Sequence, residues 1–575
     1  MSDPSSLLRT LAAAWPWSTT ADPALDGALA YLGLPTDAAT VDGAARVVGT
    51  LLGAAAVALG AAVSVATTPR WGAVVATAGA ALGAGLPLAA NRLPRLAARL
   101  ARTRALGSAA ALVGRAAMCL RIDPTVERAA AFAARTGNGA LARSLDEHVG
   151  RAEGTPRSGF ERFADEWSEG FPALSRAASR LEAAAAAPAD ERDRHLDRAV
   201  AAALEGARDE LAAFTSEIRG PVTGLYAFGV LLPLALVGVL PAARATGVRV
   251  SLPLVVGLYD VALPVVVVGA GTWLLARRPV AFPPPRIGAD HPDTPNRRLG
   301  GVAAGVGAGA VGAVVAARAV APWATPVAAL GLGTGTALVV HFRSAKRVRE
   351  RVRATEEGLH DALYLVGRRV AAGEAVEVAI AEAAGRVDGA TGDLLDEAAG
   401  RQRRLGLPVR EAFRGEAGPL STLPSRRVEG MATLLGLAAT EGRPAGDALV
   451  ATAEHVEELR RVEREARREL SRVTDTLTNT AAVFGPLVGG ATVALSDRVA
   501  GTGASAGFGA GPLPTAALGV AVGAYVLWLA AALTVLSTGL TRGLDRTLVG
   551  YRVGAALCLA TVAYCSAYVG AGLFL

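Results

Sequence analysis

Residues 454–473 read EHVEELRRVEREARRELSRV and lead at once into a long apolar segment. Glu457 precedes Arg461 by four residues, a spacing at which acid and base support a helix. Glu463 precedes Arg467 in the same way. The apolar positions recur at steps of three and four, as on one face of a helix; they are Val456, Leu459, Val462, Ala466, Leu470 and Val473. Since no Pro or Gly interrupts the stretch, the sequence predicts one helix that runs from a polar region into a membrane.

The polar region around this helix, residues 343–475, has a counterpart about 250 residues earlier, at 91–220. Two apolar segments precede each block and at least one follows it. Pro233 and Pro486 occupy corresponding places in the apolar segments that follow the blocks. Similarity at a fixed distance indicates a repeated unit. The sequence therefore predicts an all-α membrane protein with an internal duplication and two helical bundles, in which each proline bends its span.

The composition agrees with a membrane protein rich in small residues. Hydrophobic residues make up 52% of the chain, aromatic residues only 5%, and the mean hydropathy is +0.37. Small residues allow close contact between helices in lipid. The net charge of +7 is modest for 575 residues, and the basic residues gather beside apolar segments, as membrane topology requires. We therefore predict no nucleic-acid partner.

A membrane-spanning helix needs about 20 mostly apolar residues. Nine segments qualify, at residues 44–67, 71–90, 221–241, 252–276, 299–320, 323–342, 478–495, 513–538 and 549–573. Arg and Lys cluster after the second, fourth, sixth and eighth of them, which predicts that these ends face the cytoplasm. The N-terminus and both polar blocks are then cytoplasmic, and the C-terminus lies outside the cell membrane.

This topology divides the chain into alternating polar and apolar parts. The predicted parts are a cytoplasmic N-terminal segment (1–43), spans one and two (44–90), a first helical domain (91–220), spans three and four (221–276), a cytoplasmic loop (277–298), spans five and six (299–342), a second helical domain (343–475) and the last three spans (476–575).

The sequence contains no recognisable motif for catalysis or for binding a cofactor or metal. The three cysteines, Cys119, Cys558 and Cys565, cannot form a disulfide framework or a tetrahedral metal site. Lys346 is the one lysine and follows no glycine loop, which excludes a P-loop ATPase. The glycines at 301, 305 and 309 form a ridge four residues apart that favours helix packing. We predict no catalytic residue, cofactor or metal.

Asp260 lies near the middle of the fourth predicted span. An intramembrane carboxylate is costly and often functional, so a secondary transporter or channel that uses Asp260 is an alternative. The other interpretation is a hydrogen bond between helices. A membrane receptor or scaffold is a third possibility, but we find no ligand or catalytic module.

The second block resembles the type II secretion system F domain. Residues 361–375, DALYLVGRRVAAGEA, are similar to its first helix and the glycine at which that helix ends, and VEVAI at 376–380 to the start of its second helix. GLPVREAF at 406–413, the glycines at 436 and 442, and AGDAL at 445–449 continue the similarity. The first block resembles the domain less closely, since DPTVERA at 123–129 lacks the preceding glycine.

Nine spans with two cytoplasmic domains look most like the archaeal branch of this family, the membrane platform of archaella and archaeal type IV pili. The resemblance implies a non-enzymatic platform in the cytoplasmic membrane that couples a hexameric secretion ATPase to the extraction of pilin or archaellin subunits, and it implies a homodimer. We predict that the ATPase docks on exposed basic clusters of the second block, namely Arg401, Arg403, Arg404, Arg426 and Arg427.

Overall fold

The fold is seen in a computed structural model of the chain. It describes residues 4–17, 22–66, 69–137, 139–152, 158–245, 252–278, 291, 293, 298–415, 417–441, 443–501 and 515–574. Every regular element among these residues is a helix, which confirms the all-α prediction. The chain divides into two compact units, Met1–Ala105 and Leu106–Leu575, which we describe separately.

The first unit contains two short helices and a hairpin of two long helices. They are α1 (Pro4–Ala13), α2 (Pro23–Tyr31), α3 (Ala38–Ala66) and α4, which runs from Pro69 to Leu106 at the unit boundary. Gly49 and Gly83 let α3 and α4 approach closely, because a methyl group on Gly49 would lie 2.4 Å from the Gly83 carbonyl oxygen. Asn91 on α4 donates a hydrogen bond of 2.8 Å to Asp42 on α3.

Helices of the two polar blocks follow one another in the same order. The first block has α5 (Ala109–Ile122), α6 (Val126–Thr136), α7 (Ala140–Ala152), α8 (Gly159–Trp167), α9 (Pro172–Ala186) and the long α10 (Ala189–Tyr226). The second has α16 (Leu359–Ala371), α17 (Val376–Ala384), α18 (Ala390–Leu405), α19 (Val409–Arg414), α20 (Arg426–Glu441) and the long α21 (Arg443–Asn479). In both blocks a helix of 13 or 14 residues comes first and one of 37 or 38 residues comes last.

Two glycines close turns at the places where the second block resembles the F domain. Gly373, between α16 and α17, has a φ of +99°, and Gly406 after α18 has a φ of +63°. These angles lie in the left-handed region, which favours glycine. The first block has no such residue between α5 and α6, where the chain passes through Asp123–Thr125. The missing glycine thus changes the connection but not the order of the helices.

The remaining helices are mostly apolar. They are α11 (Leu232–Ala245), α12 (Leu252–Val256), α13 (Leu263–Arg277), α14 (Arg298–Ala319), α15 (Thr325–Glu357), α22 (Gly485–Gly501), α23 (Thr515–Arg542) and α24 (Arg546–Phe574). Short π turns join three pairs, namely η1 (Ala227–Leu231), η2 (Gly257–Ala262) and η5 (Thr480–Phe484), and short 3₁₀ turns form η3 (Pro322–Ala324) and η4 (Pro419–Ser421).

Eight helices within the described residues are long and apolar enough to cross a membrane, so the chain is a multi-pass membrane protein. They are Ala38–Ala62, Glu191–Val239, Leu254–Arg277, Leu299–Ala319, Pro322–Ala371, Ala445–Val499, Thr515–Arg542 and Arg546–Leu573. Each contains one of the nine predicted spans or most of it. The other predicted span, residues 71–90, forms the first half of α4, but several of its side chains lie outside the described residues.

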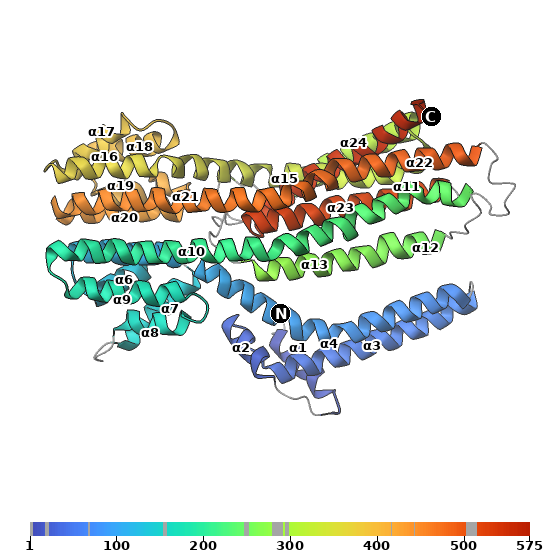
Figure 1. The fold of residues 1–575 in the computed structure, drawn as a ribbon, viewed down its shortest axis with the longest axis horizontal. Helices are drawn as coiled ribbons and strands as arrows, with labels where there is room; N and C mark the ends of the chain where they lie inside the picture. Colours follow the sequence, from blue (N-terminus) through green and yellow to red (C-terminus); the bar gives the residue numbers. More distant parts are fainter. Residues whose placement is uncertain are drawn as a thin grey trace. The chain divides into compact units, whose positions relative to one another are not determined.

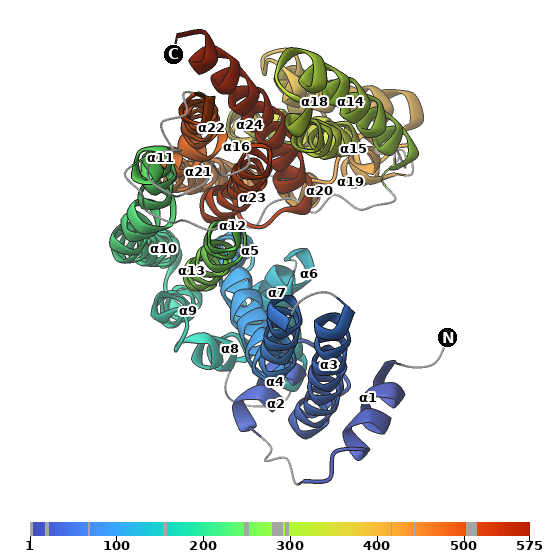
Figure 2. The same ribbon diagram turned by 90° about the vertical axis from the view of Figure 1, so that its right-hand side faces the viewer.

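Glycine contacts and one central helix organise the membrane part of the second unit. The predicted glycine ridge packs α14 against α15, since a methyl group on Gly305 would lie 2.6 Å from the Gly333 carbonyl oxygen. Gly335 of α15 approaches Gly554 of α24 in the same way. Figure 2 shows α23 among α13, α22 and α24, and its side chains include the buried Tyr525.

Within Leu106–Leu575 the two blocks lie at the same end. Helices α6 to α9 and α16 to α20 occupy one end, whereas α11, α12 and α22 reach toward the other (Figure 1). Helix α24 ends its course away from the blocks (Figure 1). The blocks share a core, because Met118 of α5 belongs to the buried cluster formed by α16 to α21.

Candidate functional site

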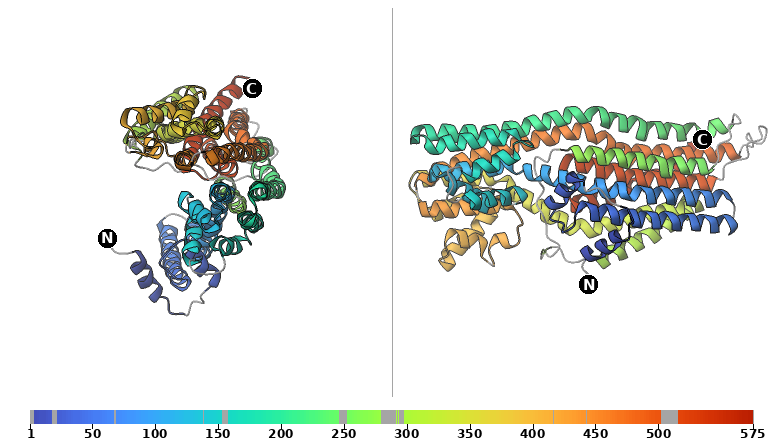
Figure 3. Two further views of the ribbon diagram at one scale, coloured as in Figure 1. Left: turned by 90° about the vertical axis from the view of Figure 1, so that its left-hand side faces the viewer. Right: turned by 90° about the horizontal axis from the view of Figure 1, so that it is seen from below.

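Two long helices connect the blocks to the membrane part. Helix α10 runs to Tyr226 and α21 to Asn479, and both continue through a π turn into an apolar helix, α11 or α22. The prediction of one helix from residue 454 into the span is therefore confirmed, and α10 runs on through Pro221. The two helices pack side by side, as the right-hand view of Figure 3 shows. Arg208 of α10 forms an ion pair with Glu458 of α21.

Each of the three π turns in the described residues ends two residues before a proline. Turn η1 precedes Pro233, η2 precedes Pro264 and η5 precedes Pro486. A proline inside a helix has no N–H and its ring clashes with the carbonyl four residues earlier. The wider π turn gives the ring room, and because proline has no N–H, that carbonyl lacks its usual helical donor. The predicted bends at Pro233 and Pro486 are thus π turns at matching places, and Pro264 adds a third.

Tyrosine hydroxyls hold the carbonyls around the first π turn. The carbonyl freed by Pro233 belongs to Gly229, and it accepts a hydrogen bond of 3.3 Å from the Tyr525 hydroxyl. The Pro233 carbonyl accepts one of 2.8 Å from the hydroxyl of Tyr259 in η2. The rings of Tyr259 and Tyr525 meet edge to face, 5.3 Å apart. Buried carbonyls in a membrane need such partners, because an unpaired one costs free energy.

Two more hydroxyls link the third π turn to the first. Thr480 of η5 donates a hydrogen bond of 3.4 Å to the hydroxyl of Tyr226, which immediately precedes η1. We call Tyr226, Tyr259, Thr480 and Tyr525 the hydroxyl cluster. Through it, the breaks in both long helices and the break before α13 contact one another, with α23 contributing Tyr525. The π turns that end α10 and α21 are therefore joined by a direct hydrogen bond.

A network of charges joins α15, α20 and α21 in the second block. Arg427, at the start of α20, contacts Glu356 at 3.2 Å and Glu463 at 2.9 Å. Glu356 also accepts a hydrogen bond of 2.6 Å from Ser425. Glu463 pairs with Arg467, as predicted, on the same helix. The exposed fractions of the Glu463 and Glu356 side chains are only 11% and 17%, so Arg427 neutralises two largely desolvated carboxylates.

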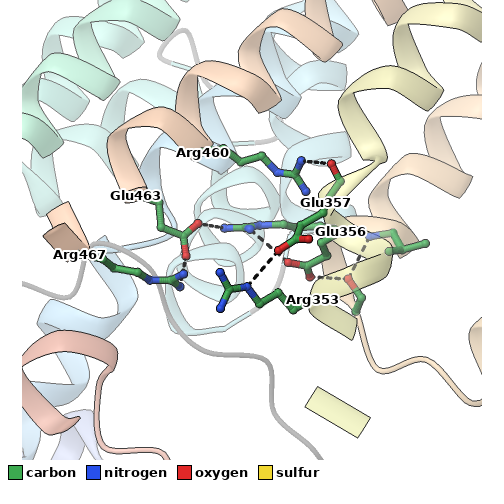
Figure 4. Close-up of polar contacts among 9 residues, drawn as sticks. Arg353, Glu356, Glu357, Arg460, Glu463 and Arg467 are labelled. Carbon is green, nitrogen blue, oxygen red and sulfur yellow. Dashed lines mark hydrogen bonds and ion pairs between the residues drawn. The ribbon is translucent and has the colours of Figure 1, made fainter. Parts of the chain in front are cut away.

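The same network extends along the end of α15. Arg460 of α21 donates a hydrogen bond of 2.7 Å to the Glu357 carbonyl oxygen, and Arg353 contacts the Glu357 carboxylate at 3.2 Å (Figure 4). Helix α15 thereby leaves the membrane part tied to α21, the helix that re-enters it. The contacts fix the base of the second block to both of its membrane connections.

The five arginines predicted to dock a partner do not behave alike. Arg403 and Arg404 lie in the last turn of α18 and are exposed, and Arg426 is exposed in the first turn of α20. Arg401 is half-buried and donates a hydrogen bond of 2.7 Å to the Ala417 carbonyl. Arg427 belongs to the charged network and is not a free surface cation. Arg401 and Arg427 are thus only half exposed and already have partners within the chain, while the docking of a partner on the five arginines stays a prediction.

A partly open pocket of about 430 Å³ lies between the blocks, among α5, α10 and α21. Its lining includes Arg121, Arg208, Asp197 and His455. The His455 ring packs on Gly114 of α5, where a methyl group would lie 2.5 Å from its Nε2 atom. Two of its arginines already pair with carboxylates, Arg208 with Glu458 and Arg121 with Asp197.

Asp260 lies in η2 and is half-buried, and within the described residues its carboxylate has neither a hydrogen bond nor an ion pair. Lys346 pairs with Glu350 at 3.3 Å and lies over the Tyr551 ring at 4.3 Å. Among the described residues, no group of His, Cys, Asp and Glu is placed so that it could hold a metal ion. The charged network and the hydroxyl cluster are therefore the main candidates for a functional role.

Comparison of the chain with protein-family models, with curated proteins and with solved structures finds no match.

Proposed function

We propose that the protein is the membrane platform of a machine that assembles a type IV pilus-like filament or secretes through one. In this proposal it resides in the cytoplasmic membrane with both blocks and the N-terminus in the cytoplasm and the C-terminus outside. It catalyses no reaction, and it transmits the motion of a hexameric ATPase to pilin-like subunits that leave the bilayer.

One observation carries the proposal. Each of two helical blocks ends in a helix of 37 or 38 residues that continues into the membrane part and changes to a π turn at a matching place. An unbroken helix transmits displacement along its axis, whereas breaks absorb or redirect it. The same order of helices in both blocks supports an internal duplication, and the position of both blocks at one end supports a common cytoplasmic side (Figure 1).

The exposed pair Arg403 and Arg404 is our proposed contact for an acidic surface of the ATPase. Charges at the rim of an interface steer association and make it sensitive to salt. Reversal of both charges, Arg403→Glu with Arg404→Glu, should lower co-purification of the cognate ATPase and stop filament assembly while membrane insertion persists. Arg368→Glu, an exposed arginine on α16 of the same block, is the matched control and should leave binding unchanged. Equal binding by both variants would place the docking surface elsewhere.

A second variant separates docking from transmission. Insertion of Gly-Pro directly after Arg467 breaks α21 where the charged network ends, before the π turn. ATPase binding should persist and assembly should stop. Normal assembly by this variant would rule out the long helix as the route of motion.

Topology is tested by cysteine labelling in intact cells. Cysteines introduced at Ala189 and Gly415 should be protected from an impermeant reagent, and one at Ser505 should react. Purified protein should neither bind nor hydrolyse ATP, since its sole lysine follows no glycine loop.

Asp260 keeps a transporter as the second candidate, because its carboxylate has no partner among the described residues. A transporter that uses this group would lose ion-dependent flux in liposomes on Asp260→Asn. A platform would show no flux with either side chain.

A further inference from the structure

Helix α3, in the first unit, has a sharp polar boundary. Arg46 is its last charged residue, and the sequence carries no charge from residue 47 to residue 68. About 20 uncharged residues cross the apolar core of a bilayer, so Arg46 marks the level at which this membrane-spanning helix meets the headgroups. Asp42, one helical turn earlier, is buried and accepts hydrogen bonds of 2.8 Å from both Arg46 and Asn91. The polar groups of the hairpin thus pair with one another at this boundary.

The first helix of the chain leads to the same boundary. Helix α1 packs against α3, and a methyl group on Gly43 would lie 3.3 Å from the Cβ atom of Ala12. Three residues further along both segments, the guanidinium carbon of Arg46 lies 5.9 Å from the ring centre of Trp15. Because both contacts advance in the same direction, α1 and the start of α3 run parallel. The chain therefore reaches the level of Arg46 just after α1 ends.

Two tryptophans lie together at this level. The rings of Trp15 and Trp17 meet edge to face with their centres 5.0 Å apart. Trp15 is half-buried, whereas 68% of Trp17 is exposed. Within the described residues, neither indole N–H has a hydrogen-bond acceptor. The pair thus presents a large apolar surface and two free donors beside the point at which α3 enters the bilayer.

The headgroup region of a bilayer satisfies both properties of this pair. Tryptophan is enriched there because its ring is mostly apolar while its N–H requires a polar partner. The ester carbonyl and phosphate oxygens of phospholipids supply acceptors, and the upper part of the acyl chains covers the ring. In water the exposed ring would have only the second of these needs met, since an apolar surface is not buried there.

We propose that Trp15 and Trp17 form an interfacial anchor, which inserts among the phospholipid headgroups beside α3 and holds the start of the chain against the bilayer surface. The occupant of this surface is lipid, because the pair adjoins a helix that crosses the bilayer and lies at the level of its last charge. The anchor is independent of the proposed platform function. It requires only that α3 spans a membrane.

The first test measures tryptophan fluorescence of the full-length protein in phosphatidylcholine vesicles. The chain has seven tryptophans, so the emission of the pair is obtained as the difference between the wild type and the variant Trp15→Phe with Trp17→Phe. Lipids brominated near the headgroup should quench this difference more strongly than lipids brominated near the chain ends or iodide in the water. Quenching by iodide alone would place the pair in water, and no quenching by any of the three would place it against protein. Either result would overturn the anchor.

A second test measures depth with nitroxide labels and needs no difference spectrum. Trp17→Cys, Leu34→Cys and Val57→Cys are made singly in a chain without its native cysteines; all three positions are exposed and lie in the first unit. Leu34 precedes α3 and is the control for water, while Val57 lies about 16 Å beyond Arg46 along α3 and is the control for the bilayer core.

The label at position 17 should be intermediate between the two controls in its accessibility to a water-soluble nickel chelate and to oxygen, which concentrates in the bilayer core. A label at 17 that is as accessible to nickel as the label at 34 would overturn the anchor. If the label at 57 also matches the one at 34, α3 does not cross the bilayer and the anchor fails with it.

Discussion

Replacement of Arg427 tests whether this arginine is structural or belongs to a docking surface. Arg427→Gln removes the charge that Glu356 and Glu463 share. Loss of one partner from a fully buried pair costs about 3–5 kcal/mol, and from an exposed pair about 0–1 kcal/mol. The two carboxylates are nearly buried but 34% of the Arg427 side chain is exposed, so we expect a loss of about 2–3 kcal/mol.

The assay is equilibrium unfolding of the full chain in mixed micelles, with increasing SDS as denaturant. The double variant Arg427→Gln with Glu463→Gln should lose less stability than Arg427→Gln alone, because it removes one of the two carboxylates that lose their contact with Arg427. Arg403→Gln, an exposed arginine of the same block, should change the free energy of unfolding by less than about 0.5 kcal/mol. If Arg427→Gln is as stable as Arg403→Gln, or if Glu463→Gln gives no rescue, the charged network does not stabilise the block.

Three further predictions concern packing, reactivity and the hydroxyl cluster. Gly114→Ala should destabilise the contact between the blocks by about 1–3 kcal/mol in the same unfolding assay, because its methyl group would lie 2.5 Å from His455. Gly150→Ala is the control: it has open space around it and should be neutral or stabilising. Burial raises the pKa of the Cys119 thiol to about 11. In a variant without Cys558 and Cys565, its reaction with maleimide at pH 8 should therefore be about 100-fold slower than that of an exposed thiol, and the rate should rise about tenfold per pH unit. Reaction at the rate of an exposed thiol would contradict the burial of Cys119. Tyr525→Phe should lower the free energy of unfolding by about 0.6–1.7 kcal/mol, since it removes the donor to the Gly229 carbonyl that Pro233 leaves unpaired. Tyr564→Phe should cost less, because its acceptor, the Gly519 carbonyl, keeps its own helical hydrogen bond. Equal losses in the two variants would refute this account.

Local sequence patterns predicted the helices and their continuity well. The apolar steps through 454–473 and the absence of Pro and Gly sufficed for α21, and the glycine at 373 marked the turn between α16 and α17. The pairing of Glu463 with Arg467 is confirmed, but that of Glu457 with Arg461 is wrong. Glu457 instead contacts Arg464 at 2.7 Å, two helical turns away, while Arg461 contacts Glu458 at 3.2 Å. Long arginine side chains choose among several acids on one face, and spacing alone does not decide between them.

Contacts between distant segments could not be predicted from the sequence. The sequence around Arg427 looks like that of any surface arginine. Its partners Glu356 and Glu463 lie 71 and 36 residues away in the chain. The hydroxyl cluster joins Tyr226 to Thr480 across 254 residues. A proline signals a disturbed helix, but whether the helix kinks or widens depends on which neighbour takes the freed carbonyl. That neighbour, Tyr525, lies 296 residues from Gly229.

The π turns have a consequence for the azimuth of the helices that follow them. A π turn accommodates one residue more than an α-helical turn, and each residue of an α-helix advances about 100° around the axis. The faces of α11 and α22 are therefore rotated by about that angle relative to a regular continuation of α10 and α21. A helical wheel drawn through either junction assigns the lipid-facing side incorrectly. If a π turn moved by one residue along its helix, the residue that it passed would rotate about the helix axis. The helix would change in length by no more than the rise of one residue, so an axial push would become a rotation.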